Sequence, residues 1–145
     1  MDAGQLQDRK ITRKQNAVLE ALLRARRPLS AYQLIRDLKS DGITWAPPTV
    51  YRALKCLIEH GLVHRVETLN AFVACGHSHV PHRNLSDTPD LIAFALCRLC
   101  GSAVEFEHPQ ISTGVSIWTE GSGFHVESAA IELRGYCKDC RSATN

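Results

Sequence analysis

The sequence predicts an α+β fold of two parts, a helical N-terminal half that closes with a β-hairpin and a small α/β half behind it. The charge supports this division, because residues 1–65 carry 12 Lys and Arg against 6 Asp and Glu, whereas residues 66–145 carry 5 against 9. The metal-ligand residue types divide in the same way, since all seven His and five of the six Cys lie within residues 60–140. A basic part beside an acidic part is typical of a polyanion-binding module joined to a second module. We therefore expect two domains, residues 1–75 and 76–145.

The composition is that of a globular protein, and the 145 residues contain no run of 18 or more apolar residues. The polar N-terminus shows no signal-peptide pattern, so we expect a cytoplasmic protein with no membrane partner. Disulfides are rare in that compartment. Metal binding or packing must therefore account for the six cysteines.

Apolar residues at helical spacing predict three helices in the basic half. Capping boxes at Thr12 and Gln15 and at Ser30 and Gln33 begin the first two, and the pair Pro47–Pro48 begins the third. The stripes expected to face the core are Val18, Leu19, Leu22, Leu23 and Ala25, then Ala31, Leu34, Ile35 and Leu38, and finally Val50, Leu54, Leu57 and Ile58. The expected stops are Pro28, the pair Asp41–Gly42, and Gly61.

After Gly61 the sequence changes to strand patterns. Residues 62–67 and 71–74 are separated by a short turn, which predicts a β-hairpin. Three short helices followed by such a hairpin in a basic context predict a winged helix-turn-helix, whose third helix would enter the major groove of DNA. The alternative is a winged helix that binds protein, which predicts no salt-dependent affinity for DNA.

The third helix would present most of the DNA contacts. Arg52 and Tyr51 lie near its N-terminal turn, where side chains reach base edges, and arginine suits a bidentate contact to guanine. Better candidates for contacts with phosphates are Arg13, Lys14 and Lys55. Tyr32, at the start of the second helix, could face phosphate or pack in the core. The full set of expected contacts is Arg13, Lys14, Tyr32, Thr49, Tyr51, Arg52 and Lys55.

Two C-x-x-C knuckles, Cys97 to Cys100 and Cys137 to Cys140, are separated by 36 residues. Four thiolates in this arrangement fit a closed tetrahedral zinc site. A thioredoxin-like redox pair is the alternative, and it is disfavoured because neither motif is expected to open a helix after a strand in a βαβ pattern.

A second ligand cluster is predicted around Cys75, with His64, Glu105 and a loop of histidines. Sulfur combined with imidazole favours zinc over the harder ligand sets that suit ferrous iron or manganese. The residues of the loop that could join the cluster are His77, His79, His82 and Asp90.

The second half is predicted to form a small sheet with one helix. Residues 91–96, 103–106 and 124–133 are expected strands, and Ile111, Val115 and Trp118 mark a helix that ends before Gly121. An edge strand and an apolar face make this half a dimerisation module, although the helical residues could equally be core. A zinc hydrolase is disfavoured, because the sequence has no H-E-x-x-H pattern and no nucleophile paired with a base. We expect no enzyme activity and no small-molecule substrate.

These motifs, in this order, resemble the ferric uptake regulator family, and within it the zinc uptake regulators. The resemblance spans roughly residues 10–141. It rests on residues 30–34 (SAYQL), 47–54 (PPTVYRAL), 61–67 (GLVHRVE), 70–75 (NAFVAC) and the two knuckles. It implies a homodimer that binds a palindromic operator and represses zinc uptake genes when zinc is replete, with an iron or peroxide sensor of the same family as the alternative.

The resemblance also implies which residues hold about two zinc ions per protomer. The knuckle cysteines Cys97, Cys100, Cys137 and Cys140 match the family's structural site. His64, Cys75 and Glu105 match a regulatory site whose fourth ligand is taken as His82, with His77, His79 and Asp90 as alternatives. Tyr32 and Arg52 match positions that contact DNA in the family. Ala46 replaces the basic residue that is often found before the proline pair. Ser128 stands where relatives often carry a ligand of a third site, which argues against such a site here.

Overall fold

The computed structural model describes residues 11–75 and 91–143. The chain divides into two compact units, residues 1–80 (unit 1) and residues 81–145 (unit 2). The division falls within residues outside the described ranges, so the boundary between 75 and 76 stays a prediction.

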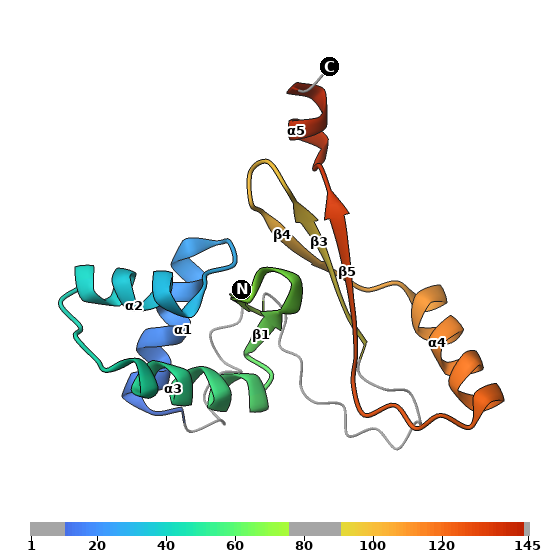
Figure 1. Cartoon of the computed structure of the whole chain (residues 1–145), viewed down its shortest axis with the longest axis horizontal. Helices are drawn as coiled ribbons and strands as arrows, with labels where there is room; N and C mark the ends of the chain where they lie inside the picture. The colour runs from blue at the N-terminus through green and yellow to red at the C-terminus, as the bar shows by residue number, and fades with distance from the viewer. Residues whose placement is uncertain (1–10, 76–90, 144–145) are drawn as a thin grey trace, which may run out of the picture. The chain divides into compact units, whose positions relative to one another are not determined.

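In its described part, unit 1 begins with helices α1 (Arg13–Ala25), α2 (Ala31–Ser40) and α3 (Pro47–Glu59) (Figure 1). The predicted starts are confirmed, because Thr12 and Ser30 each accept from the backbone of the third helical residue in a complete capping box. Prolines occupy the first turn of α3, where the missing N–H costs no hydrogen bond. Gly61 takes a φ of +69° directly after this helix, a conformation that favours glycine.

The three helices pack around one apolar core. Leu22, Leu34 and Leu57 are at most 2% exposed and come from α1, α2 and α3 in turn. Two predictions were wrong: Leu23 is 50% exposed and Ile58 is 37% exposed. Both follow a buried leucine directly, and a step of one residue turns a helical side chain by about 100°, away from the buried face.

The hairpin predicted as a wing is present. Strands β1 (Val63–Val66) and β2 (Ala71–Ala74) pair antiparallel, joined by a 3-10 turn at Glu67–Leu69. Asn70 closes this turn with a φ of 47°, a left-handed conformation that asparagine tolerates. The backbones of Phe72 and Leu29 exchange two hydrogen bonds, of 2.9 and 2.7 Å. The hairpin is therefore fastened to the segment that links α1 to α2.

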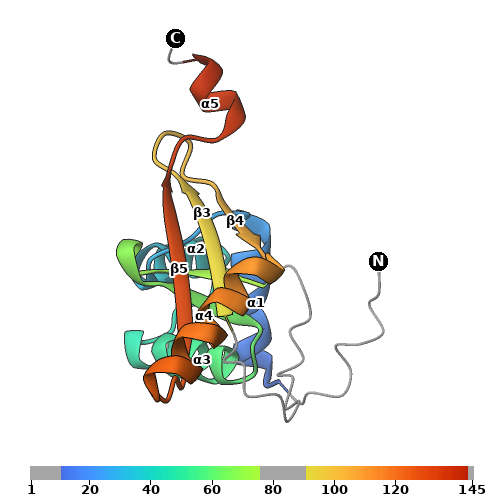
Figure 2. The ribbon, with the colours of Figure 1, turned by 90° about the vertical axis from the view of Figure 1, so that its right-hand side faces the viewer.

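Unit 2 contains strands β3 (Leu91–Cys97), β4 (Ala103–Phe106) and β5 (Ala129–Gly135) in the order β4-β3-β5 (Figures 1 and 2). β3 and β4 are antiparallel, whereas β3 and β5 are parallel, and the chain between them contains β4 and helix α4 (Pro109–Ser122). The chain ends its described part with the short helix α5 (Lys138–Ala143).

Three details of unit 2 differ from the sequence prediction. α4 runs past Gly121 to Ser122 and is capped by Gly123, which takes a φ of +69°. β5 begins at Ala129 rather than at Phe124. α5 was not predicted, because six residues are too few to show an apolar period. None of the helices in the described ranges is long and apolar enough to cross a membrane.

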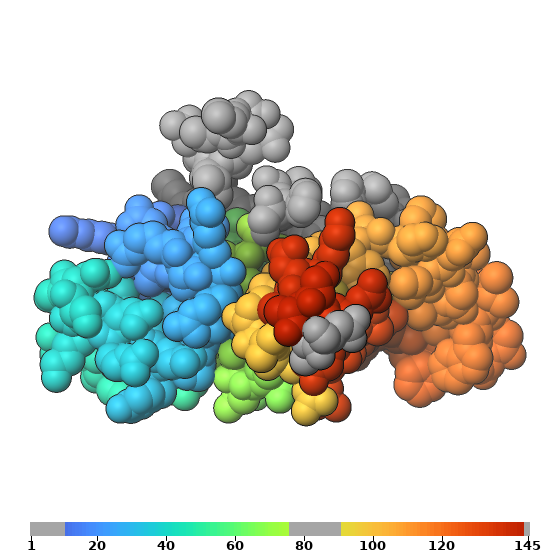
Figure 3. All heavy atoms as spheres, turned by 90° about the horizontal axis from the view of Figure 1, so that it is seen from above, coloured from blue at the N-terminus to red at the C-terminus, as the bar shows by residue number. Residues whose placement is uncertain are grey.

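The surface of unit 2 exposes large apolar side chains. Helix α4, orange in Figure 3, has no buried residue. Its Trp118 stacks at a tilt against Phe124, with their ring centroids 5.8 Å apart. The exposed set on α4, its flanking loop and the edge strands is Val104, Ile117, Trp118, Phe124 and Leu133. The prediction that the helical residues could be ordinary core is wrong for Trp118, which is 60% exposed in the single chain.

Candidate metal centres and nucleic-acid surface

The two cysteine knuckles lie at the same end of the sheet of unit 2 (Figures 1 and 2). Cys97 ends β3 and pairs with Gly135, the last residue of the parallel strand β5. Parallel strands end at the same edge, so Cys137, two residues beyond β5, arrives beside Cys97. A backbone hydrogen bond of 2.8 Å from Arg98 to Gly135 holds the two knuckles together.

The first knuckle is a tight turn between β3 and β4. Gly101 takes a φ of +73° there, which a side chain would strain. Its N–H donates to the Cys97 carbonyl over 3.1 Å, and the Cys97 N–H donates to the Ser102 carbonyl over 2.9 Å. This turn directs Cys97 and Cys100 toward one point.

The four knuckle sulfurs have the spacing of a tetrahedral metal site. They all lie within 4.8 Å of one another, and the Sγ atoms of Cys100 and Cys137 are 3.9 Å apart. Four sulfurs bound to one zinc at 2.3 Å are separated by about 3.8 Å, whereas a disulfide needs about 2.05 Å. None of the six cysteines, which all lie in the described ranges, forms a disulfide. The donor set and its spacing therefore fit zinc and not a pair of disulfides.

The second knuckle has part of the setting of a redox pair. Cys137 follows a strand and α5 begins at the next residue, but no strand follows α5 in the described residues, so this knuckle is not part of a βαβ unit there. The sequence pattern did not predict α5, so it did not place a helix after the second knuckle. A metal site is favoured over a redox pair because the cysteines of both knuckles lie together, whereas a redox pair needs only one knuckle.

The knuckle thiols differ in acidity when no metal is bound. Backbone N–H groups, that of Cys137 first, lower the pKa of Cys97 to about 6. Hydrogen bonding with the Ser102 hydroxyl, 3.1 Å away, lowers the pKa of Cys100. The neighbouring Cys137 sulfur raises the pKa of Cys140 to about 12. At neutral pH Cys97 is thus a thiolate and Cys140 a thiol, so a metal must displace the Cys140 proton.

These pKa values predict how zinc affinity of the knuckles depends on pH. Cys140 releases its proton on binding at any pH below about 12, so affinity falls as pH falls. Below about pH 6 Cys97 is protonated as well and must release a further proton. We expect a plot of log affinity against pH to steepen by about one on passing below pH 6. Competition with a chelator between pH 5 and 8 would measure it, and an unchanged slope would contradict the Cys97 assignment.

A second group of ligand atoms lies in the hairpin of unit 1. His64 on β1 is buried, and its Nε2 atom is hydrogen-bonded to the Sγ of Cys75. His64 faces Val73 across the hairpin, so Cys75, two residues further, is its diagonal neighbour on the same face. The Cys75 N–H donates to the Leu62 carbonyl over 2.9 Å, which holds the thiol beside the imidazole. An imidazole and a thiol in contact are a zinc-type donor pair.

The other residues of the predicted regulatory site belong to unit 2 or to undescribed segments. Glu105 lies half-buried in β4, opposite Phe94 of β3. His82, taken as the fourth ligand, lies outside the described residues, as do its alternatives His77, His79 and Asp90. The ligand set of this site beyond His64 and Cys75 is therefore still a prediction.

The surface expected to contact DNA is exposed in unit 1. Tyr51, Arg52 and Lys55 are exposed on α3, while Thr49 is half-buried in its first turn. Tyr32 is 75% exposed, which decides against packing in the core. At the start of α1 Arg13 is exposed, and Lys14 places its ammonium 5.8 Å from the centre of the Trp45 ring. Arg65 and Asn70, which face α3 from the hairpin, were not predicted as contacts, although strand alternation could have indicated Arg65.

Known proteins resemble this chain over most of its length. A model of the ferric uptake regulator family matches residues 7–134. A zinc uptake regulation protein of Escherichia coli strain K12 is 34% identical over 113 residues, which are 77% of this chain and 61% of that protein. The chain thus spans less than two thirds of the length of this relative. A peroxide operon regulator of Bacillus subtilis strain 168 is 26% identical over 141 residues, 94% of this chain and 87% of that protein.

Solved structures agree with the fold. A zinc uptake regulator complexed with zinc and DNA matches with a TM-score of 0.83 and 29% identity, covering 96% of this chain and 88% of that one. The crystal structure of holo XcZur matches with a TM-score of 0.77 and 32% identity, covering 92% of this chain and 89% of that one.

The helices and hairpin of unit 1 form a winged helix-turn-helix, and unit 2 gathers four cysteines that could hold a metal, an arrangement that fits the ferric uptake regulators. The chain belongs to the ferric uptake regulator family.

Proposed function

We propose that this protein is a zinc-responsive repressor of zinc uptake genes, which binds a palindromic DNA operator as a zinc-loaded homodimer in the cytoplasm. The observation that carries the proposal is the pairing of His64 and Cys75 inside the wing of the DNA-reading unit. A metal held there acts on the same hairpin that lies against α3. The names of the E. coli and Mycobacterium tuberculosis relatives, both zinc uptake regulation proteins, support zinc as the metal.

Two zinc sites per protomer are proposed. The structural site is Cys97, Cys100, Cys137 and Cys140, whose sulfurs are already gathered. The regulatory site is His64, Cys75, Glu105 and His82, in which Glu105 would tie the sheet of unit 2 to the wing of unit 1. Zinc supplies a fixed tetrahedral centre when bound. The chain's own contribution is to hold His64 in β1, so that ligation restrains the wing and the DNA-reading helix beside it.

DNA recognition is proposed for the exposed face of unit 1. Arg52 and Tyr51 on α3 would contact base edges, with Thr49 at the start of the same helix. Lys55, Arg13 and Tyr32 would contact phosphates and so position the helix. Two copies are needed to read a palindrome, and the exposed apolar residues of α4 and the edge strands of unit 2 offer a surface for self-association.

The experiment is a binding titration on DNA chosen by the protein itself. Duplexes are selected from a random pool with zinc-loaded protein, and affinity is then measured with zinc, ferrous iron, manganese or a chelator. We expect zinc to raise affinity by about 10- to 100-fold over the chelator, within the usual range of allosteric coupling. Equal affinity in chelator and zinc would contradict the sensor, and a response to iron in place of zinc would favour the iron or peroxide sensor.

A further inference from the structure

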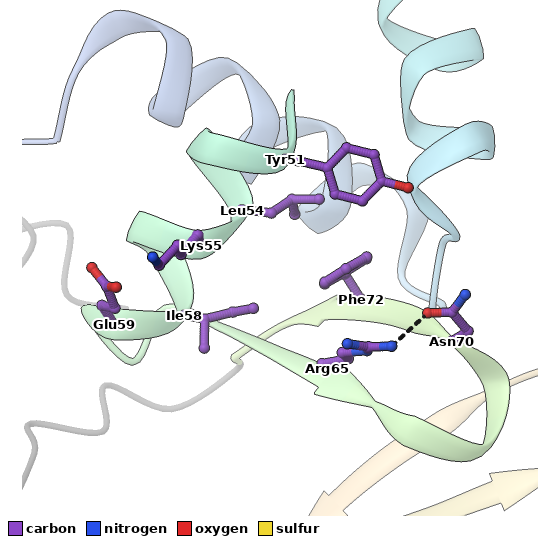
Figure 4. A pocket seen from close by; sticks show the side chains of 8 residues that line it. All are labelled: Tyr51, Leu54, Lys55, Ile58, Glu59, Arg65, Asn70 and Phe72. Carbon is purple, nitrogen blue, oxygen red and sulfur yellow. Dashed lines mark hydrogen bonds between the residues drawn. The ribbon is translucent and has the colours of Figure 1, made fainter. Parts of the chain in front are cut away.

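A pocket of about 420 Å³ lies between α3 and the wing of unit 1. Figure 4 shows its two walls, with Tyr51, Leu54, Lys55, Ile58 and Glu59 on α3 and Arg65, Asn70 and Phe72 on the hairpin. Its floor is apolar and its rim is polar. Glu59, the acidic lining residue, lies beside Lys55 at the end of the pocket away from Arg65 (Figure 4).

Arg65 reaches this pocket because it alternates with His64 along β1. His64 is buried, and the next side chain of a strand points to the opposite face. The Arg65 side chain lines the pocket and is 47% exposed, and Figure 4 shows its guanidinium directed toward Asn70. One strand therefore carries the metal-type ligand on one face and a cation toward α3 on the other.

The Arg65 guanidinium is held in one orientation by two neighbours in the wing. Its Nη2 donates to the Asn70 Oδ1 over 2.9 Å, and its Nε lies 3.6 Å from a Glu67 carboxylate oxygen. Guanidinium has five N–H donors, so these two contacts leave donors for a further acceptor. Fixing the side chain in advance lowers the entropy lost when that acceptor binds.

The opposite wall adds a donor on the side of Arg65. Tyr51 and Lys55, one turn apart on α3, both line the pocket, but Figure 4 shows the Tyr51 hydroxyl on the side of Asn70 and the Lys55 ammonium at the far end, near Glu59. A guanidinium and a hydroxyl at one end of the pocket favour an anion there. Such a groove between a helix that enters the major groove and its wing suits the sugar-phosphate backbone, whose sugars can cover the apolar floor.

We propose that Arg65 binds a phosphate of the DNA backbone, and that Asn70 is a positioning residue that orients it. This inference rests on the proposed function, because it needs unit 1 to bind duplex DNA. Glu67 competes with the phosphate for the same guanidinium. Binding exchanges the Glu67 contact for the phosphate contact, while the Asn70 bond is kept.

The test measures affinity for a random-sequence 30-base-pair duplex by fluorescence anisotropy across a salt series, with the full zinc-loaded protein. A phosphate contact is independent of sequence, so no operator is required. For Arg65→Ala we expect about tenfold weaker binding and a slope of log affinity against log salt that is less steep by about one for each protomer bound. Arg24→Ala is the matched control, because Arg24 is also an exposed, ion-paired arginine and lies at the end of α1 opposite Arg13.

Two further variants separate contact from folding. Asn70→Gly keeps the left-handed backbone and removes the side-chain amide that accepts from Arg65, and we expect weaker binding with an unchanged thermal midpoint. Glu67→Gln removes the competitor, and we expect tighter binding, whereas Glu20→Gln on α1 should change little. If the Arg65→Ala protein folds and keeps the wild-type affinity and salt slope, the inference about Arg65 is wrong but the proposed function is not affected. A wild-type protein that does not bind the duplex would overturn the proposed function with it.

Discussion

Replacement of Cys137 by serine is expected to remove one zinc per protomer and to unfold or loosen the end of unit 2 where the knuckles meet. The Cys137 Sγ is 3.9 Å from the Cys100 Sγ, and the backbone N–H of Cys137 donates to the Cys97 Sγ. Cys137 therefore connects both knuckles. Structural zinc sites contribute on the order of 10 kcal/mol to folding, so the loss should lower the thermal midpoint by more than about 10 °C. Zinc content by mass spectrometry and the midpoint by circular dichroism measure the two effects.

Cys56→Ser is the matched control for this substitution. Cys56 is a half-buried free thiol on α3 and belongs to neither group of ligand residues. We expect this variant to keep its zinc content and most of its stability. The structural-site proposal would be wrong if Cys137→Ser kept full zinc content, or if both variants lost zinc equally.

Replacement of Cys75 by serine should abolish the zinc dependence of DNA binding without unfolding the protein. Serine keeps the size of the side chain but is a poor zinc ligand beside His64, to whose Nε2 the thiol is now bonded. We expect the second zinc to be lost and the affinity in zinc to fall by about 10- to 100-fold, to the level in chelator. The knuckle zinc should remain, because those sulfurs lie in unit 2.

This experiment separates sensing from DNA recognition. Arg52→Ala, on the exposed face of α3, should weaken binding in zinc and in chelator alike while leaving both zinc ions in place. A Cys75→Ser protein that kept zinc-dependent affinity would show that the wing does not carry the sensor. If the Cys75→Ser protein also kept its second zinc ion, the regulatory ligands would have to be other residues of the chain.

Local signals predicted the helices of unit 1 well. The capping boxes at Thr12 and Ser30 and the proline start of α3 involve residues within one turn, so a short stretch of sequence contains the whole interaction. The prediction was wrong for Leu23 and Ile58, because the width of a buried stripe depends on the elements that pack against it. α5 was missed for want of length.

The sequence by itself determined the residue types of both ligand groups, the winged-helix pattern and the family. Only the tertiary structure decided that Cys97 and Cys137 meet, that the second knuckle opens a helix, and that Arg65 faces α3. The physical reason is distance along the chain. The pairing of β3 with β5 joins residues about 40 positions apart, and the pocket joins a helix to a hairpin, so neither is encoded in any local period.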